Sequence, residues 1–144
     1  MKVVLALFAS ICCFSIQAQS IVGKWKTIDD ETGKPKSIVE IFEKNGKLYG
    51  KVVKLFREPH EVQDPVCSEC EDDRKGKKVI GMEILRDMAK EGDEWSDGTI
   101  CDPKNGKIYD CELWLDPSNA NQLKVRGYIL FLYRTQTWMR YTGS

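Results

Sequence analysis

Cysteines carry the clearest chemical signal in this sequence. Cys67 and Cys70 form a C-x-x-C pair inside the charged stretch CSECEDDRKGKK, and Cys101 and Cys111 flank the stretch DPKNGKIYD. A C-x-x-C pair can be the active site of a thiol oxidoreductase, half of a zinc site, or a structural disulfide. The neighbouring residues discriminate among these three uses.

A redox-catalytic use is disfavoured by the charges around the pair. A thioredoxin-type pair lies at a helix N-terminus, which lowers the pKa of the attacking thiol. Here Pro65 precedes the pair, and acidic side chains lie within it or just after it, at Glu69, Glu71, Asp72 and Asp73. Negative charge opposes formation of a thiolate, so this environment is unsuited to a reactive thiol.

The spacing of Cys101 and Cys111 limits how the four cysteines after residue 20 can combine. DPKNG is typical of a hairpin turn, so the two residues should lie on antiparallel strands, well over ~10 Å apart at ~3.3 Å per residue. A disulfide needs Cα atoms within about 7 Å of each other. Three arrangements remain open: a Cys67–Cys70 disulfide with two buried thiols, pairing of the loop cysteines onto the hairpin, and a zinc site that recruits a hairpin cysteine or His60. We predict the Cys67–Cys70 disulfide and no metal site.

Other signs of catalysis are scarce. His60 is the one histidine, and a single histidine in a charged loop is usually solvated. The sequence patterns of serine hydrolases, zinc proteases, phosphate-binding loops and dinucleotide-binding folds are missing. Carboxylates could pair for acid–base work, among them Glu40, Asp102, Asp110 and Glu112, although Asp102 is more simply a turn residue. We assign no catalytic residue and no cofactor.

Basic and aromatic side chains near the C-terminus could form a binding site. Six of them have even residue numbers along the last two expected strands, which would place them on one face: Arg126, Tyr128, Arg134, Gln136, Trp138 and Arg140. A turn near residues 131–133 could break that register. Facing the barrel interior, they could bind a carboxylate or phosphate and cover an apolar group. Facing outward, they would form a basic stripe or a partner surface.

These residues lie on elements with the pattern of a β-barrel. Turn signals such as Asn45-Gly46, DPKNG and DPSNANQ separate the β-rich segments. Their number and close spacing predict an all-β, single up-and-down antiparallel barrel of about eight strands. Residues 57–78 are charged and broken by proline, so we expect one long loop across an opening or an edge. Residues 80–92 are expected to form a strand, with a helical turn at its start left open.

The first and last strands supply residues that could close such a barrel. Gly23 allows close approach of the backbone, and Trp25 can plug one end with a large apolar body. First and last strands are neighbours in a closed meander, so Arg134 or Arg140 could stack on Trp25 in a cation–π contact worth about 1 kcal/mol. Residues 47–56 carry polar side chains on both faces, which suits either a partly polar interior or a lysine at the rim.

Four stretches, GKWKTIDD, DPKNGKIYDCELWL, LKVRGYI and YRTQTWMR, lie along the chain after residue 20. Their combination resembles the exported bacterial family named domain of unknown function 2147, and the early G-x-W is similar to that of lipocalin-type and fatty-acid-binding-type barrels. The resemblance implies a small β-barrel-like domain outside the cytoplasm and brings no established activity.

The N-terminus and the composition bound location and partners. Residues 1–18 combine a lysine, an apolar run and small residues, as in a secretory signal peptide. We therefore expect a single barrel domain at 19–144, periplasmic or secreted, with no membrane span in the mature chain. Lys and Arg together number 22, as do Asp and Glu, so a nucleic-acid partner is disfavoured.

These observations predict an exported barrel that binds a small amphipathic or anionic ligand non-covalently. One alternative is an interaction module whose disulfide-clipped loop docks an envelope protein. The other is a metal-binding or hydrolytic domain.

Overall fold

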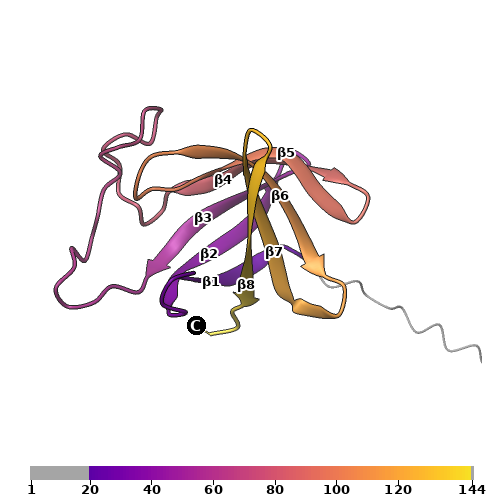
Figure 1. Ribbon diagram of the computed structural model, residues 1–144, viewed down its shortest axis with the longest axis horizontal. Helices are drawn as coiled ribbons and strands as arrows, with labels where there is room; N and C mark the ends of the chain where they lie inside the picture. Colours follow the sequence, from indigo (N-terminus) through magenta and orange to yellow (C-terminus); the bar gives the residue numbers. More distant parts are fainter. Residues whose placement is uncertain (1–19, 144) are drawn as a thin grey trace, which may run out of the picture.

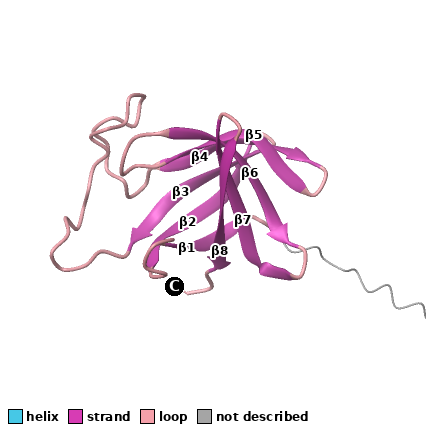
Figure 2. Ribbon diagram, viewed as in Figure 1, coloured by secondary structure: helices cyan, strands magenta, loops and turns pink. Residues whose placement is uncertain are grey.

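Turn chemistry and alternating apolar residues divide the chain into strands (Figures 1 and 2). The computed structural model describes residues 20–143, so the predicted signal peptide at 1–18 lies outside the described residues. Eight antiparallel strands pair in chain order and close into a barrel, which confirms the predicted fold. They are β1 (Gly23–Ile28), β2 (Pro35–Lys44), β3 (Lys47–Leu55), β4 (Glu83–Glu91), β5 (Glu94–Cys101), β6 (Ile108–Asp116), β7 (Asn119–Ile129) and β8 (Leu132–Arg140).

The β2–β3 hairpin forms where the sequence predicts it. Asn45 and Gly46 have φ angles of 54° and 77°, the left-handed values that this tight turn requires. The segment before β4 contains a hydrogen-bonded turn between Val79 and Met82 and no helix, so the helical alternative was wrong. No helix that could span a bilayer occurs between residues 20 and 143.

One end of the barrel is filled by Trp25, which is fully buried. Its indole nitrogen donates a hydrogen bond of 2.8 Å to the carbonyl of Ile21. The guanidinium of Arg140 lies 4.3 Å from the centroid of the Trp25 ring. Gly23 begins β1 with a φ of 136°. The guanidinium of Arg140 is the group nearest to the position that a Cβ would take at Gly23. The first and last strands therefore meet at a seam fixed by a cation–π contact.

The core extends from this seam along the interior of the barrel. Inward-facing side chains alternate along the strands, and the most deeply buried are aromatic and aliphatic. They form one contiguous cluster that includes Trp25, Ile41, Leu48, Leu85, Met88, Leu113, Leu123 and Trp138. The cluster also includes Val52, Val79, Cys101 and Val125, which lie toward the other end of the barrel.

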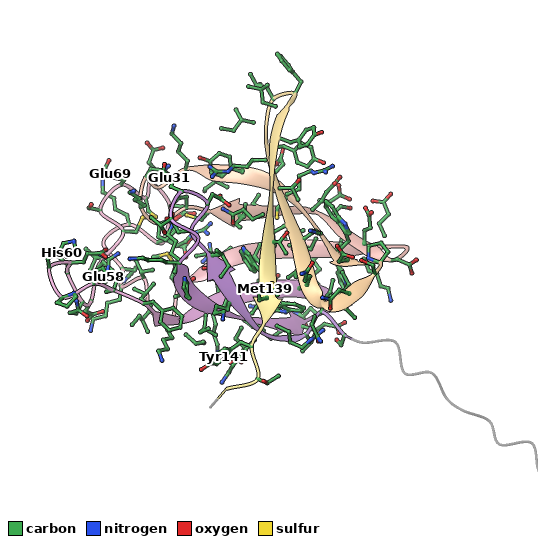
Figure 3. The ribbon with its side chains drawn as sticks, turned by 60° about the horizontal axis from the view of Figure 1, so that its bottom comes forward. Glu31, Glu58, His60, Glu69, Met139 and Tyr141 are labelled. Atoms are coloured by element: carbon green, nitrogen blue, oxygen red, sulfur yellow. A yellow bond between two sulfur atoms is a disulfide. The ribbon has the colours of Figure 1, made fainter. Side chains whose placement is uncertain are left out.

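The long loop between β3 and β4 lies at the other end of the barrel, on the left in Figure 1. Cys67 and Cys70 form a disulfide within it, with Cα atoms 5.5 Å apart, which confirms the predicted pair. Buried Arg74 donates a hydrogen bond of 2.9 Å to the carbonyl of Glu83. His60 lies on the outer part of the loop, away from the barrel (Figure 3). The loop is therefore fastened to β4 through its cysteine-containing part.

An ion pair adds a second attachment between the loop and β4. Both terminal nitrogens of Arg86 donate to the carboxylate of Asp73, at 2.8 and 2.9 Å. Hydrogen bonding from this guanidinium lowers the pKa of Asp73 to about 2. Asp73 is therefore ionised at neutral pH and holds the loop against the strand.

Candidate functional site

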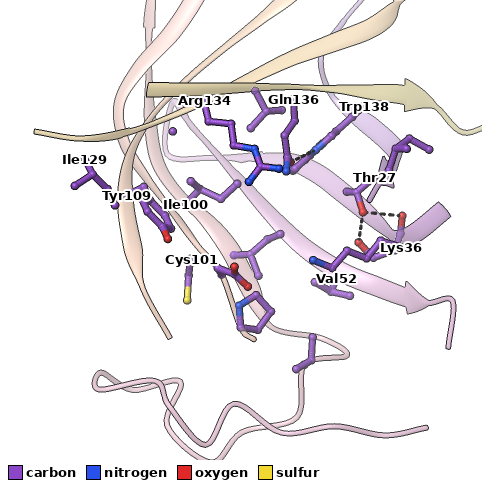
Figure 4. A pocket seen from close by; sticks show the side chains of 18 of the residues that line it. Thr27, Lys36, Val52, Ile100, Cys101, Tyr109, Ile129, Arg134, Gln136 and Trp138 are labelled. Atoms are coloured by element: carbon purple, nitrogen blue, oxygen red, sulfur yellow. Dashed lines mark hydrogen bonds between the residues drawn. The ribbon is translucent and has the colours of Figure 1, made fainter. Parts of the chain in front are cut away.

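A cavity of about 450 Å³ lies in the half of the barrel opposite Trp25 (Figure 4). It is bounded by the ends of β1, β3, β5 and β7, the starts of the strands that follow them, and Val79 of the long loop. Its volume is within the range of ~300–1,000 Å³ that is usual for small-molecule sites. Most of its wall is apolar, with side chains that include Val52, Leu55, Ile84, Ile100, Val125 and Trp138.

Polar groups interrupt this apolar wall at defined places. Thr27 and Ser37 face each other from β1 and β2, and their hydroxyl oxygens are 2.7 Å apart. Both residues are buried and line the cavity. The exposed Lys36 beside them and the half-buried Tyr109 on β6 also line it. The cavity therefore offers hydroxyl groups and one lysine to a ligand that otherwise contacts apolar side chains.

A second polar group connects the segment after β1 with strand β8. Asp30, just after β1, accepts a hydrogen bond of 2.8 Å from the side-chain amide of Gln136 on β8 and forms an ion pair with Arg134. Gln136 in turn accepts a hydrogen bond of 3.2 Å from the indole of Trp138. Side chains thus connect β1 and β8 beyond the short backbone ladder near Trp25, where Arg140 is its partner.

Only part of the predicted stripe faces the cavity. Arg134, Gln136 and Trp138 line it, whereas Arg126 and Tyr128 do not. Ile129 pairs with Leu132 across the turn, so even-numbered residues of β7 lie opposite odd-numbered residues of β8. The expectation that all six side chains share one face was therefore wrong, because the turn breaks the parity.

Arg126 and Tyr128 instead lie on the outer surface. The guanidinium carbon of Arg126 lies 4.4 Å from the ring centroid of Tyr133 and 4.9 Å from that of Trp114. The hydroxyl of Tyr128 donates a hydrogen bond of 2.8 Å to Glu112. Burial is the main reason that the pKa of Tyr128 is raised. These side chains are held by their neighbours on the outside of the barrel.

Arg140, the sixth residue of the stripe, lies at the filled end of the barrel. Besides stacking on Trp25, it donates hydrogen bonds of 3.0 Å to the carbonyl of Ser20 and 2.9 Å to that of Ala120. From its position on β8 it therefore joins the N-terminal segment and the start of β7. These contacts give it a structural position outside the cavity.

Cys101 and Cys111, the free cysteines within residues 20–143, have different surroundings, although both are buried. Cys101 lines the cavity, and its Sγ lies 3.9 Å from the Sγ of Cys70 in the loop. Burial raises the pKa of Cys101, and it raises that of Cys111 to about 12. The loop cysteines thus touch the hairpin without being bonded to it. Within residues 20–143, no three His, Cys, Asp or Glu side chains gather in a metal-binding cluster.

Several cavity residues were missed in the sequence. Tyr109 could have been found, because it alternates with Cys111 and Leu113, which are buried on the same face of β6. Lys36 carried no such signal, and neither did Asp30, which does not line the cavity but contacts Arg134 and Gln136 of its wall. Each lies in or beside the polar connection between β1 and β2, where no alternation assigns a face.

Comparisons with known proteins address the fold. The structure of protein HP1028 from the human pathogen Helicobacter pylori, described as belonging to the lipocalin family, superposes with a TM-score of 0.71 at 19% sequence identity. The match covers 87% of this chain and 85% of that one, so the two share a fold. No curated protein matches the sequence.

The sequence also matches a protein family over most of its length. The matched residues, 23–140, run from the glycine that begins β1 to the arginine that stacks on Trp25. The match therefore spans the whole barrel, including both sides of its seam. The chain belongs to the family described as "Uncharacterized protein conserved in bacteria (DUF2147)".

Proposed function

We propose that this protein binds a small amphipathic molecule in its barrel cavity. The observation that carries the proposal is the cavity of about 450 Å³, whose wall is apolar apart from a few convergent polar groups. Such a combination suits a ligand with an apolar body and one polar head. The HP1028 structure is described as a lipocalin, and a ligand in the barrel interior is the corresponding expectation for this chain.

The cavity wall suggests how an anionic head would be held. Lys36 lines the cavity and makes no ion pair with any carboxylate in residues 20–143, so its ammonium group is available. Arg134 shares the carboxylate of Asp30 with Gln136. A ligand carboxylate could compete with Asp30 for Arg134, because arginine binds carboxylates in a two-pronged geometry. The apolar body would then contact Val125 and Ile100.

We further propose that the protein acts after export, in the periplasm or outside the cell. The Cys67–Cys70 disulfide supports this location, because disulfides persist in oxidising compartments. The predicted signal peptide at 1–18 is the second argument.

Gly127 offers a direct test of the cavity. An added Cβ at this position would lie 3.5 Å from the Cβ of Tyr109 and 3.8 Å from Ile100, which are ordinary contact distances. Gly127→Ala should therefore fit, whereas the larger side chain of Gly127→Leu should occupy cavity volume. We expect decanoate to displace a fluorescent anilinonaphthalene sulfonate probe from the wild-type protein and from Gly127→Ala. Gly127→Leu should bind decanoate at least tenfold more weakly while keeping its circular dichroism spectrum.

Decanol serves as the uncharged comparison. A weaker competition by decanol than by decanoate would support an anionic head near Lys36 and Arg134. Equal binding of decanoate by the Ala and Leu variants would contradict the proposed site, as would the absence of saturable binding by the wild type.

A further inference from the structure

The β7–β8 hairpin ends in an exposed apolar tip. Leu130 and Phe131 form the turn, and 89% and 88% of their surfaces are exposed. Leu132 follows at 65% exposure, and the hairpin stands clear of the rest of the barrel (Figure 3). Leu130 has a φ of 54°, a left-handed conformation that turns usually assign to Gly or Asn. A leucine at this strained position indicates that its apolar side chain has a use.

The chemistry of the hairpin changes in layers away from the tip. The rings of Tyr128 and Tyr133 come next, with centroids 5.9 Å apart. Arg126 follows, stacked on Tyr133 and donating a hydrogen bond of 2.8 Å to Thr135. Within residues 20–143 no carboxylate lies at ion-pair distance from Arg126, whereas Arg134 on the inner face is paired with Asp30. Along the outer face of the hairpin, apolar side chains at the tip are therefore followed by tyrosine rings and then by a cationic guanidinium.

We propose that this hairpin tip docks the protein on a lipid bilayer. The layers match those of a membrane interface: Leu130 and Phe131 would enter the acyl boundary, the tyrosines would lie among the headgroups, and Arg126 would face the phosphates. A narrow, convex tip is poorly suited to a protein partner, because a stable protein interface buries about 1,600 Å² in total. Insertion of a few side chains needs no such area.

The tip also forms part of the cavity mouth. Ile129, Leu132 and Tyr133 line the cavity and lie directly beside the turn. Docking through the tip would therefore place the cavity at the bilayer surface, from which an amphipathic ligand could enter. The docking itself depends on the outer side chains alone and does not rest on the proposed ligand binding.

Vesicle binding tests this proposal. Full-length mature protein would be sedimented with vesicles of phosphatidylethanolamine and phosphatidylglycerol, and in parallel with vesicles of phosphatidylcholine. We expect binding to both, stronger to the anionic vesicles. The double variant Leu130→Ser, Phe131→Ser should bind at least tenfold more weakly. Both side chains are almost fully exposed, so the fold should be retained.

Three comparisons make the result specific. Val62→Ser removes an apolar side chain that is 67% exposed on the long loop and should leave vesicle binding unchanged. The fluorescence of a Phe131→Trp variant should be quenched by lipids brominated on their acyl chains. Gly127→Leu should bind vesicles like the wild type, which separates docking from the cavity.

Equal vesicle binding by the wild type and the serine double variant would overturn the proposal. So would a dimer, seen by sedimentation velocity, that requires Leu130 and Phe131 and forms while vesicles fail to bind, since the tip would then serve a second copy of the chain.

Discussion

Cys70 lies between two sulfur atoms with which it could bond. It is bonded to Cys67, and the Sγ of Cys101 lies 3.9 Å from its own Sγ. Exchange would require the Cys101 thiolate to attack the disulfide. Because burial raises the pKa of Cys101, that thiolate is scarce at neutral pH and becomes more abundant as pH rises. The Cys67–Cys70 bond is therefore protected by the protonation of its neighbour.

Removing Cys67 should transfer the disulfide. In Cys67→Ser, Cys70 loses its partner while Cys101 stays beside it, so we expect a Cys70–Cys101 disulfide after oxidative folding. Non-reducing peptide mapping would detect the linked peptides. Cys111→Ser is the matched control and should retain the Cys67–Cys70 bond, because Cys111 takes no part in this contact. Free thiols at both Cys70 and Cys101 in Cys67→Ser would contradict the expectation.

The sequence contained the residue types of the candidate site but not their orientation. Arg134 and Arg126 look equivalent in the sequence, yet Arg134 lines the cavity and Arg126 lies on the outer surface. Their difference depends on the length of one turn. Leu130 and Phe131 are apolar and carry none of the Gly, Asn or Pro signals that place a turn. The sequence therefore indicated that a turn near residues 131–133 could change the parity, but not whether it does.

At the scale of elements, the long loop packs against the turn between β5 and β6. Gly106 of that turn has a φ of 71°, and an added Cβ would clash with the carbonyl oxygen of Glu69. Position 106 therefore requires glycine for two reasons: the left-handed backbone conformation and the close approach of the loop. The same turn begins with Asp102, whose carbonyl accepts a hydrogen bond of 2.8 Å from the amide of Gly106.

Alanine substitution should separate these two requirements. Gly33 has a similar φ of 69° but no atom within 4 Å of an added Cβ, so Gly33→Ala should cost about 1 kcal/mol for backbone strain alone. Gly106→Ala should cost about 3 kcal/mol, because the clash with Glu69 adds an overpacking penalty. Urea denaturation would measure both losses of stability. Equal losses would show that the loop is not held against the turn.

Elements were easier to predict than their contacts. Asn45-Gly46 and DPKNG each specify a turn through local backbone preferences, and alternating side chains between them specify strands. The path of residues 57–78 depends instead on contacts such as Arg74 with Glu83 and Gly106 with Glu69, which join the loop to residues outside it. Local sequence patterns therefore predict the barrel, but they do not predict how the long loop packs at its end.

For the whole molecule, one end of the barrel contributes to stability and the other end holds the proposed binding site. One end is filled by Trp25 and tied by Arg140, and the other holds the cavity beneath Arg134. The backbone ladder between β1 and β8 pairs Trp25 with Arg140 and Lys26 with Met139. Because that ladder is short, side-chain contacts at the filled end should contribute much of the closure.

Replacing the two arginines should reveal this division. Arg140→Leu loses the stacking on Trp25 and hydrogen bonds to Ser20 and Ala120, so we expect it to lower the free energy of unfolding by about 2–4 kcal/mol. Arg134→Leu removes an ion pair whose arginine side chain is 68% exposed, and it should cost about 1 kcal/mol or less. Urea denaturation of both variants checks the ranking.

The same two variants should reverse their order in ligand binding. Arg134→Leu alters the cavity wall and should weaken decanoate binding, whereas Arg140→Leu, measured well below its unfolding midpoint, should leave that binding unchanged. The physical reason is distance along the barrel: the seam at Trp25 and the cavity lie at opposite ends of β1 and β8. Equal stability losses for the two variants would show that the short ladder closes the barrel without Arg140.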